Sequence, residues 1–85
     1  MIGKDSFCAN SFECMKTIKG ETITKVVQAE GGFVLFFESG YSLTIKQGEF
    51  RGDKLGYAVF WVNNREDTER IENDVKKRID LKWQN

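Results

Sequence analysis

Apolar and polar positions alternate through residues 22–45 in three short runs separated by glycines. Gly31-Gly32 separates the first two runs, and Ser39-Gly40 separates the second from the third. Two-residue hairpin loops favour turns with positive φ, a conformation that glycine adopts without a Cβ clash. The pattern therefore predicts three antiparallel strands joined by two turns of two residues each.

Counting outward from these two turns predicts a register, and with it two faces of the sheet. Ala29 then lies opposite Val34, and Phe36 lies opposite Leu43. Opposite residues share a face because side chains alternate along a strand. The predicted core face carries Val27, Ala29, Val34, Phe36, Leu43 and Ile45.

The reverse face of this predicted sheet is too apolar to stay in water. The middle strand places Phe33, Leu35 and Phe37 there at a spacing of two. A plain solvent face does not carry three large apolar side chains in a row. We expect the N-terminal segment, a second subunit or a target protein to cover them. The apolar residues of the N-terminal segment that are expected to give partial cover are Phe12, Met15 and Ile18.

The flanking residues predict a short helix before these strands and a fourth strand after them. Residues 11–19 have apolar positions at helical spacing, with Asn10 as the N-cap and Glu13 at the spacing of a capping box. Residues 1–8 show no period and are expected to form a loose arm. Residues 55–62 are apolar on both sides, as in a strand that is covered on two faces.

A loop and a C-terminal helix complete the predicted fold. Residues 47–54 show no period and predict the longest loop. Asn63-Asn64 ends the fourth strand and is expected to cap a helix, in which acidic residues precede basic ones, as the helix dipole favours. Its narrow apolar stripe, which includes Ile71 and Val75, is expected to pack on the core face of the sheet.

Together these elements predict one α+β domain over residues 1–85. The expected order is α-β-β-β-β-α, with a four-stranded antiparallel sheet, a C-terminal helix packed on one face and a short N-terminal helix. Thirteen basic and thirteen acidic residues give a net charge of zero, so long-range attraction to nucleic acid or an anionic membrane is not expected. No apolar run approaches the length of about 18 residues that a membrane-spanning helix needs. The N-terminus lacks the apolar stretch of a signal peptide, so a cytoplasmic location is expected.

The chemistry of the chain favours binding over catalysis. The chain has no histidine, so acid–base catalysis would need other groups with strongly shifted pKa values. Cys8 and Cys14 are the only cysteines, whereas structural zinc needs four Cys or His ligands. We therefore expect two reduced thiols, no metal, no cofactor and no enzymatic activity.

The excess of apolar side chains on the reverse face is the main candidate for an interface. Aromatic residues are enriched at protein interfaces and dominate their energetics. Homodimerisation would also help so small a domain to bury more of its surface. The predicted interface residues, with two from the fourth strand if it aligns that way, are Phe33, Leu35, Phe37, Tyr57 and Trp61.

Two alternatives remain open at this stage. A nucleic-acid-binding or transcription-regulatory module would use the basic end of the last helix, namely Lys76, Lys77, Arg78 and Lys82. Glu72, Asp74 and Asp80 are interleaved with these residues, which favours an ordinary solvated helix face. The second alternative is a small-ligand binder with its cavity at a dimer interface.

A sequence pattern adds one resemblance over residues 20–45. Gly20-Glu21-Thr22-Ile23-Thr24-Lys25-Val26, then Leu35-Phe36-Phe37-Glu38-Ser39-Gly40, then Leu43-Thr44-Ile45 is similar to small phage- and prophage-encoded β-hairpin proteins. Where such proteins have known roles, they block or redirect a host or defence protein by binding it. The resemblance implies a phage or mobile-element protein that inhibits a host or defence factor, and it implies no catalytic residues.

Overall fold

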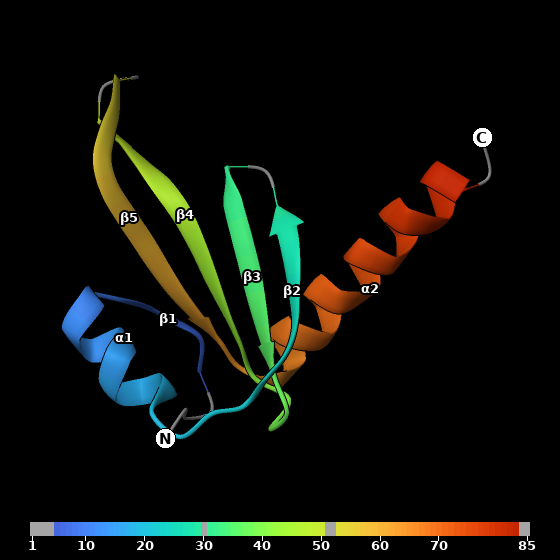
Figure 1. Ribbon diagram of the computed structural model, residues 1–85, viewed down its shortest axis with the longest axis horizontal. Coiled ribbons are helices and arrows are strands. Elements are labelled where there is room, and N and C mark those ends of the chain that lie inside the picture. Colours follow the sequence, from blue (N-terminus) through green and yellow to red (C-terminus); the bar gives the residue numbers. More distant parts are fainter. Residues whose placement is uncertain (1–4, 30, 51–52, 84–85) are drawn as a thin grey trace.

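Five strands form a single antiparallel sheet in the computed structural model (Figure 1). The structure describes the backbone of residues 5–29, 31–50 and 53–83, and the side chains within them apart from those of residues 49–50, 53–57 and 78–83. The sheet order is β1-β5-β4-β3-β2. In chain order the elements are β1 (Phe7–Ala9), α1 (Ser11–Ile18), β2 (Ile23–Ala29), β3 (Gly32–Phe37), β4 (Ser42–Phe50), β5 (Asp53–Asn63) and α2 (Arg65–Trp83).

The α+β class and the antiparallel sheet are confirmed, but the prediction of four strands is wrong. The additional strand is β1, which pairs with β5 so that Phe7 lies opposite Val62 and Ala9 opposite Phe60. A strand of three residues is too short to show a period, which is why the sequence pattern predicted a loose arm here. β1 and β2 therefore form the two edges of the sheet.

The first predicted turn is displaced by one residue. Ala29 pairs with Gly32, so Gly32 begins β3 and Gly31, at φ 75°, lies in the turn. This change moves the pairing of β2 and β3 by two positions, so Val27 lies opposite Val34. A shift of two preserves the faces, since side chains alternate with a period of two.

The second turn holds three residues, 38–40, where two were predicted. The amide of Gly40 donates to the carbonyl of Phe37 at 3.0 Å, and the amide of Phe37 donates to the carbonyl of Tyr41 at 2.9 Å. Gly40 has φ 95°, which fits a type I turn followed by a residue in the left-handed region. Ser39 is poorly suited to positive φ, so the loop gains a residue and Gly40 takes that position.

The extra loop residue shifts β4 by one position against β3, which exchanges the two faces of β4. Leu43 lies opposite Leu35, and Ile45 lies opposite Phe33. The prediction that Leu43 and Ile45 share a core face with Val34 is therefore wrong. A polar residue of β4 takes the place opposite Val34.

The loop predicted over residues 47–54 is also wrong in large part. β4 and β5 continue through it as a hairpin, with Phe50 opposite Asp53. A register shift between Gln47 and Glu49 marks a β-bulge, which interrupts the alternation that would have indicated a strand. The predicted fourth strand is confirmed within β5.

Both helices begin with the predicted asparagine caps. The side-chain oxygen of Asn10 accepts from the amide of Glu13 at 2.8 Å, and its Nδ2 donates to Glu13 Oε1 at 2.6 Å. The side-chain oxygen of Asn64 accepts from the amide of Asp67 at 2.8 Å. These bonds satisfy amides that the first turn of a helix leaves without partners.

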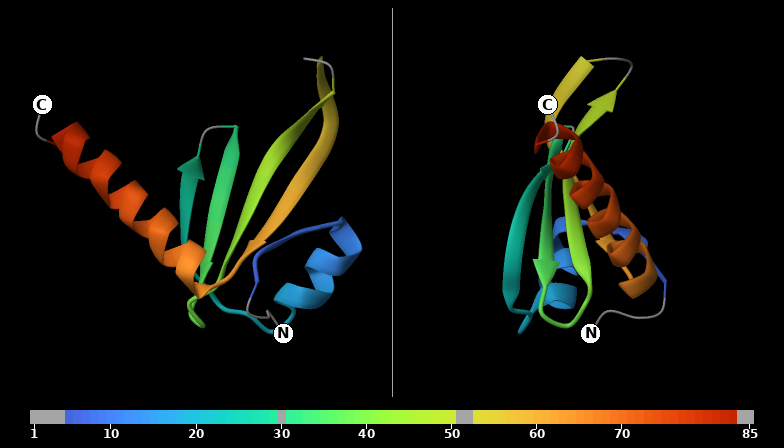
Figure 2. Two further views of the ribbon diagram at one scale, coloured as in Figure 1. Left: turned by 180° about the vertical axis from the view of Figure 1, so that it is seen from behind. Right: turned by 90° about the vertical axis from the view of Figure 1, so that its right-hand side faces the viewer.

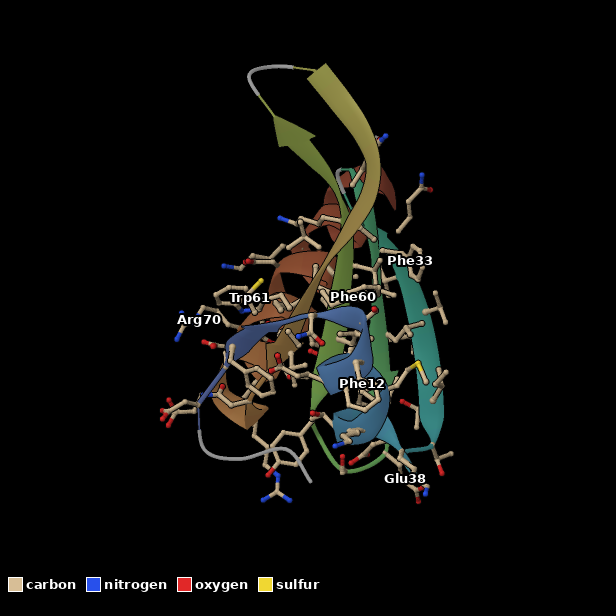
Figure 3. All side chains as sticks on the ribbon, turned by 90° about the vertical axis from the view of Figure 1, so that its left-hand side faces the viewer. Phe12, Phe33, Glu38, Phe60, Trp61 and Arg70 are labelled. Carbon is tan, nitrogen blue, oxygen red and sulfur yellow. The ribbon has the colours of Figure 1, made fainter. Side chains whose placement is uncertain are left out.

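The two helices lie on opposite faces of the sheet. In Figure 2, right, α2 lies in front of the strands and α1 behind them, and Figure 3 shows the reverse side. The main apolar core is on the α1 side, where a buried cluster is built from Ala9, Cys14, Phe37, Leu43 and Val62. The predicted packing of the C-terminal helix on the face of Leu43 is therefore wrong. α2 lies on the other face, with Val34 and Phe36.

A buried polar network connects α2 to the sheet. Ser42 Oγ and Thr68 Oγ1 are 2.8 Å apart, and Asn63 Nδ2 donates to Ser42 Oγ at 3.1 Å and to Thr44 Oγ1 at 2.9 Å. All four residues are at least 92% buried, since none is more than 8% exposed. Buried polar groups are costly unless they are hydrogen-bonded, so this network specifies where α2 meets β4 and β5.

The contribution of the network can be measured with Thr68→Val. The substitution keeps the shape of the side chain but removes the hydroxyl that reaches Ser42. We expect the free energy of unfolding to fall by about 1 kcal/mol, the usual net value of a buried hydrogen bond. The matched control is Thr17→Val in α1, where the hydroxyl bonds the carbonyl of Glu13 at a less buried position. Urea denaturation that gives equal stabilities for the two variants would contradict this assignment.

α2 crosses the sheet diagonally, and its C-terminal part extends past the edge strand β2 (Figure 1). An ion pair between Lys25 Nζ of β2 and Glu72 Oε1 of α2, at 3.3 Å, lies along this path. Val75, about one turn further along α2, is still buried at 8% exposed, so α2 remains packed against its own sheet beyond this pair.

Candidate protein-binding surface

Large apolar side chains are exposed mainly on one side of the molecule. Of six such residues among the described side chains, Trp61 lies on the α2 face, because it is opposite Thr44. The other five come from α1 or from the sheet face against which α1 packs. We call these five the α1-side patch: Phe12, Met15, Ile23, Val26 and Phe33.

The short length of α1 explains why this patch exists. α1 has eight residues and turns Cys14 and Ile18 towards the buried cluster. Its opposite side carries Phe12 and Met15, which are 64% and 67% exposed. Figure 3 shows Phe33 beyond the end of the sheet face that α1 covers. The helix thus covers part of the sheet and adds two exposed apolar side chains of its own.

The three apolar residues of β3 have different surroundings in the structure. Phe37 is 4% exposed and belongs to the buried cluster. Leu35 is half-buried and packs against the same cluster. Phe33 is 39% exposed. The N-terminal helix therefore covers Phe37, which was one of the expected possibilities. The role of all three residues at an interface stays a prediction.

The residues expected to join them from the fourth strand do not do so as predicted. Trp61 lies opposite Thr44, whereas Phe60 lies opposite Ile45 on the α1 side. Figure 3 shows Phe60 among the strands behind α1. The side chain of Tyr57 lies outside the described residues. The grouping of Trp61 with Phe33 is thus corrected, because the one-residue shift of β4 also decides which side of β5 faces α1.

Four members of the patch were not among the predicted interface residues. Phe12 and Met15 were assigned to the covering side of the helix, but the i, i+4 pair Cys14 and Ile18 takes that role. The spacing of three between Phe12 and Met15 was the available signal for a second apolar side of α1. Ile23 and Val26 are exposed because β2 is an edge strand, which the strand pattern did not reveal.

The described part of the basic end of α2 is an exposed helix surface that carries both basic and acidic residues. Lys76 and Lys77 are exposed, with Asp74 nearby in the same helix. The side chains of Arg78 and Lys82 lie outside the described residues. Phosphate binding needs an unopposed basic surface, so the nucleic-acid alternative stays a prediction without added support.

Among the described residues, two hollows border α2, and some of their charged groups already have partners. The larger has a volume of about 590 Å³ and includes Lys25, Arg65 and Glu72 in its lining. Lys25 pairs with Glu72, and Arg65 Nε donates to the carbonyl of Ser39 at 3.1 Å. The smaller, of about 330 Å³, lies between β4, β5 and α2. Both hollows are open to solvent, whereas a small-ligand site encloses most of the ligand's surface.

The groups that could support other chemistry are few. Among the described residues, no three His, Cys, Asp or Glu side chains are placed to hold a metal ion. Cys8 is exposed and Cys14 is buried, and neither forms a disulfide. Burial raises the pKa of the Cys14 thiol, so it stays protonated and poorly nucleophilic near neutral pH. Over the described residues, neither helix has the length and apolar character that crossing a bilayer requires.

Comparison of the sequence and the fold with known proteins matched no protein-family model, no curated protein and no solved structure. The function is therefore argued from the residues themselves.

Proposed function

We propose that this protein is a non-enzymatic module that binds another protein through the α1-side patch. The observation that carries the proposal is the segregation of exposed apolar residues: among the described side chains, five of the six large ones lie on the side of α1. Single apolar residues scattered over a surface are common and need no explanation. A concentration on one side, with two phenylalanines in it, is typical of binding sites.

The energetics of the patch are sufficient for binding. Full burial of one large apolar side chain contributes about 1.5–3 kcal/mol. The members of the patch contribute little to the protein's own core, because each leaves between 39% and 67% of its surface exposed. A partner that covers several of them recovers this unused burial energy. α1 and the sheet also hold them in place before the partner arrives, which lowers the entropic cost of association.

The class of partner is proposed on the sequence resemblance. Where small phage and prophage proteins with a similar hairpin pattern have known roles, they act by stoichiometric binding, so a host or defence protein is the partner we favour, and inhibition is the effect. The absence of histidine from the chain is compatible with binding as the whole function.

The proposal is tested with a substitution on each side of the sheet. Met15→Asp places a charge in the α1-side patch, whereas Trp61→Asp places one on an exposed aromatic of the α2 face. Immobilised wild-type protein and both variants are incubated with host lysate, and a protein retained by the wild type is then purified and its affinity measured. We expect Met15→Asp to weaken this affinity about 30-fold or more, the effect of one interface hot spot, and Trp61→Asp to leave it within about threefold.

Folding and specificity controls accompany this comparison. Thermal melting followed by circular dichroism must show that each variant is folded at the assay temperature. Equal affinities of wild type and Met15→Asp would contradict the proposal. Retention that disappears on nuclease treatment would also contradict it and would favour the alternative that uses Lys76 and Lys77.

A further inference from the structure

The two edges of the sheet differ in how well they are protected against pairing. β1 has three residues, whereas β2 has seven. Within the described residues, no strand pairs with the outer edge of β2. Natural proteins protect such edges with short strands, bulges, prolines or outward lysines, because unpaired amides and carbonyls recruit another strand. The short β1 follows this rule, and β2 does not.

The protective devices within β2 leave most of its edge open. The chain has no proline, and the register shift in β2 falls between Ile23 and Lys25, at the beginning of the strand. Lys25 Nζ turns onto the α2 side, where it bonds Glu72 Oε1 at 3.3 Å and lies 4.8 Å from the ring centre of Phe36. The strand after Lys25 is regular and carries no charge.

The register identifies which backbone groups point outward. Ala29 and Gly32 close the two-residue hairpin as a pair, and such closing pairs exchange hydrogen bonds. Bonded and non-bonded pairs alternate along an antiparallel ladder, so Val27 bonds inward, towards β3. Val26 and Gln28 therefore direct their amides and carbonyls to the free edge.

α2 supplies a second feature at the same edge. Its C-terminal part extends past β2 (Figure 1). The acidic residues Glu69 and Asp74 precede Val75, and the basic residues Lys76 and Lys77 follow it. Glu72 also precedes Val75, but it is paired with Lys25 of β2. Arg70 interrupts this order, but it pairs with Asp67 in its own helix at 3.5 Å. Two copies of such a helix attract one another when they lie antiparallel, since each acidic part then meets a basic part.

We infer that a second copy of this chain pairs with β2, so that two five-stranded sheets join into one across a two-fold axis near Val26. Antiparallel pairing about this axis brings Val26 opposite its own symmetry mate and places no like charges opposite each other in the strand. The same axis makes the two α2 helices antiparallel over the junction. A second copy is thus complementary to both the strand edge and the overhanging helix, and an unrelated extended peptide would match only the strand.

The mass in solution tests this inference. Light scattering on a sizing column is expected to give wild-type protein twice the chain mass of 9.8 kDa. Val26→Lys places two lysines opposite each other at the axis, and we expect it to raise the dissociation constant of the dimer about 30-fold or more. Val26 is 59% exposed in the single chain, so the variant should still fold, as circular dichroism will check. Met15→Lys is the control and should remain a dimer.

Hydrogen exchange provides a site-specific readout. The amide of Gln28 should be protected at high protein concentration and should exchange faster on dilution, because its partner is the second copy. The amide of Val27 bonds within the chain and should be protected at both concentrations. Lys76→Glu combined with Lys77→Glu removes the basic part of α2 and should weaken the dimer about tenfold at low salt.

Several results would overturn the inference. These are a single-chain mass at every concentration, an unweakened dimer in Val26→Lys, and a Gln28 amide whose protection appears only when another protein binds. The outcome is separable from that of the proposed function. Loss of partner capture in Met15→Asp with an intact dimer supports both the proposed function and the dimer. A monomeric protein that still captures its partner contradicts the dimer alone.

Discussion

Gly32→Ala is expected to lower the free energy of unfolding by about 3 kcal/mol, the upper end of the usual cost of overpacking. A Cβ atom at this position would lie 1.9 Å from the backbone oxygen of Ile45 and 2.9 Å from its carbonyl carbon. Backbone cannot move aside as a flexible side chain can, so β3 and β4 would have to separate. For a domain with a free energy of unfolding of roughly 5 kcal/mol or a little more, most of that stability would be lost.

The control for this prediction is the neighbouring Gly31→Ala. A Cβ at Gly31 meets no atom within 4 Å, but φ is 75°, so the cost is conformational and about 1 kcal/mol. Urea denaturation at fixed temperature measures both variants. A Gly32→Ala protein that is as stable as Gly31→Ala would show that β3 and β4 do not approach as closely as described.

Leu43→Ala is the second substitution with a large expected effect. Leu43 is 1% exposed and lies within the cluster on the α1 side. Truncation of a fully buried leucine lowers the free energy of unfolding by about 2–5 kcal/mol, because apolar burial is lost and a cavity is left behind. Ile23→Ala, at a position that is 53% exposed, is the control and should cost less than about 1 kcal/mol. Thermal and urea unfolding of the two variants provide the comparison.

A double-mutant cycle with Leu43→Ala also tests the register of β4. In the structure Leu43 lies opposite Leu35, on the face away from Phe36. The pair Leu43→Ala and Leu35→Ala should therefore show a coupling of about 0.5 kcal/mol or more, whereas Leu43→Ala and Phe36→Ala should be additive. The register expected from two-residue turns predicts the reverse, so the cycle separates the two arrangements directly.

The parts of the candidate surface that could be predicted were those that depend on local composition. Phe33 was identified because three apolar residues alternate along one strand; it is 39% exposed in the structure, and its role at an interface stays a prediction. Phe12 and Met15 were assigned to the core side of α1, because an eight-residue helix with several apolar positions does not reveal which of its sides meets the sheet. Trp61 was grouped with Phe33 on the condition that the fourth strand aligned that way, and it lies on the other face because the turn at residues 38–40, far earlier in the chain, holds an additional residue.

The caps of both helices, the hairpin order and the α+β class follow from the sequence alone, because each depends on residues close together in the chain. Asn10 and Asn64 need only the next turn of helix as partner. The tertiary structure decided the formation of the additional strand β1, the length of the second turn and the face on which each helix lies. β1 exists as a strand only because β5 offers an edge to pair with, and one additional loop residue before Tyr41 reverses which side chains of β4 and β5 are buried. These features depend on contacts between segments that are distant in the chain. The pattern of residues within one segment does not show which of these contacts form.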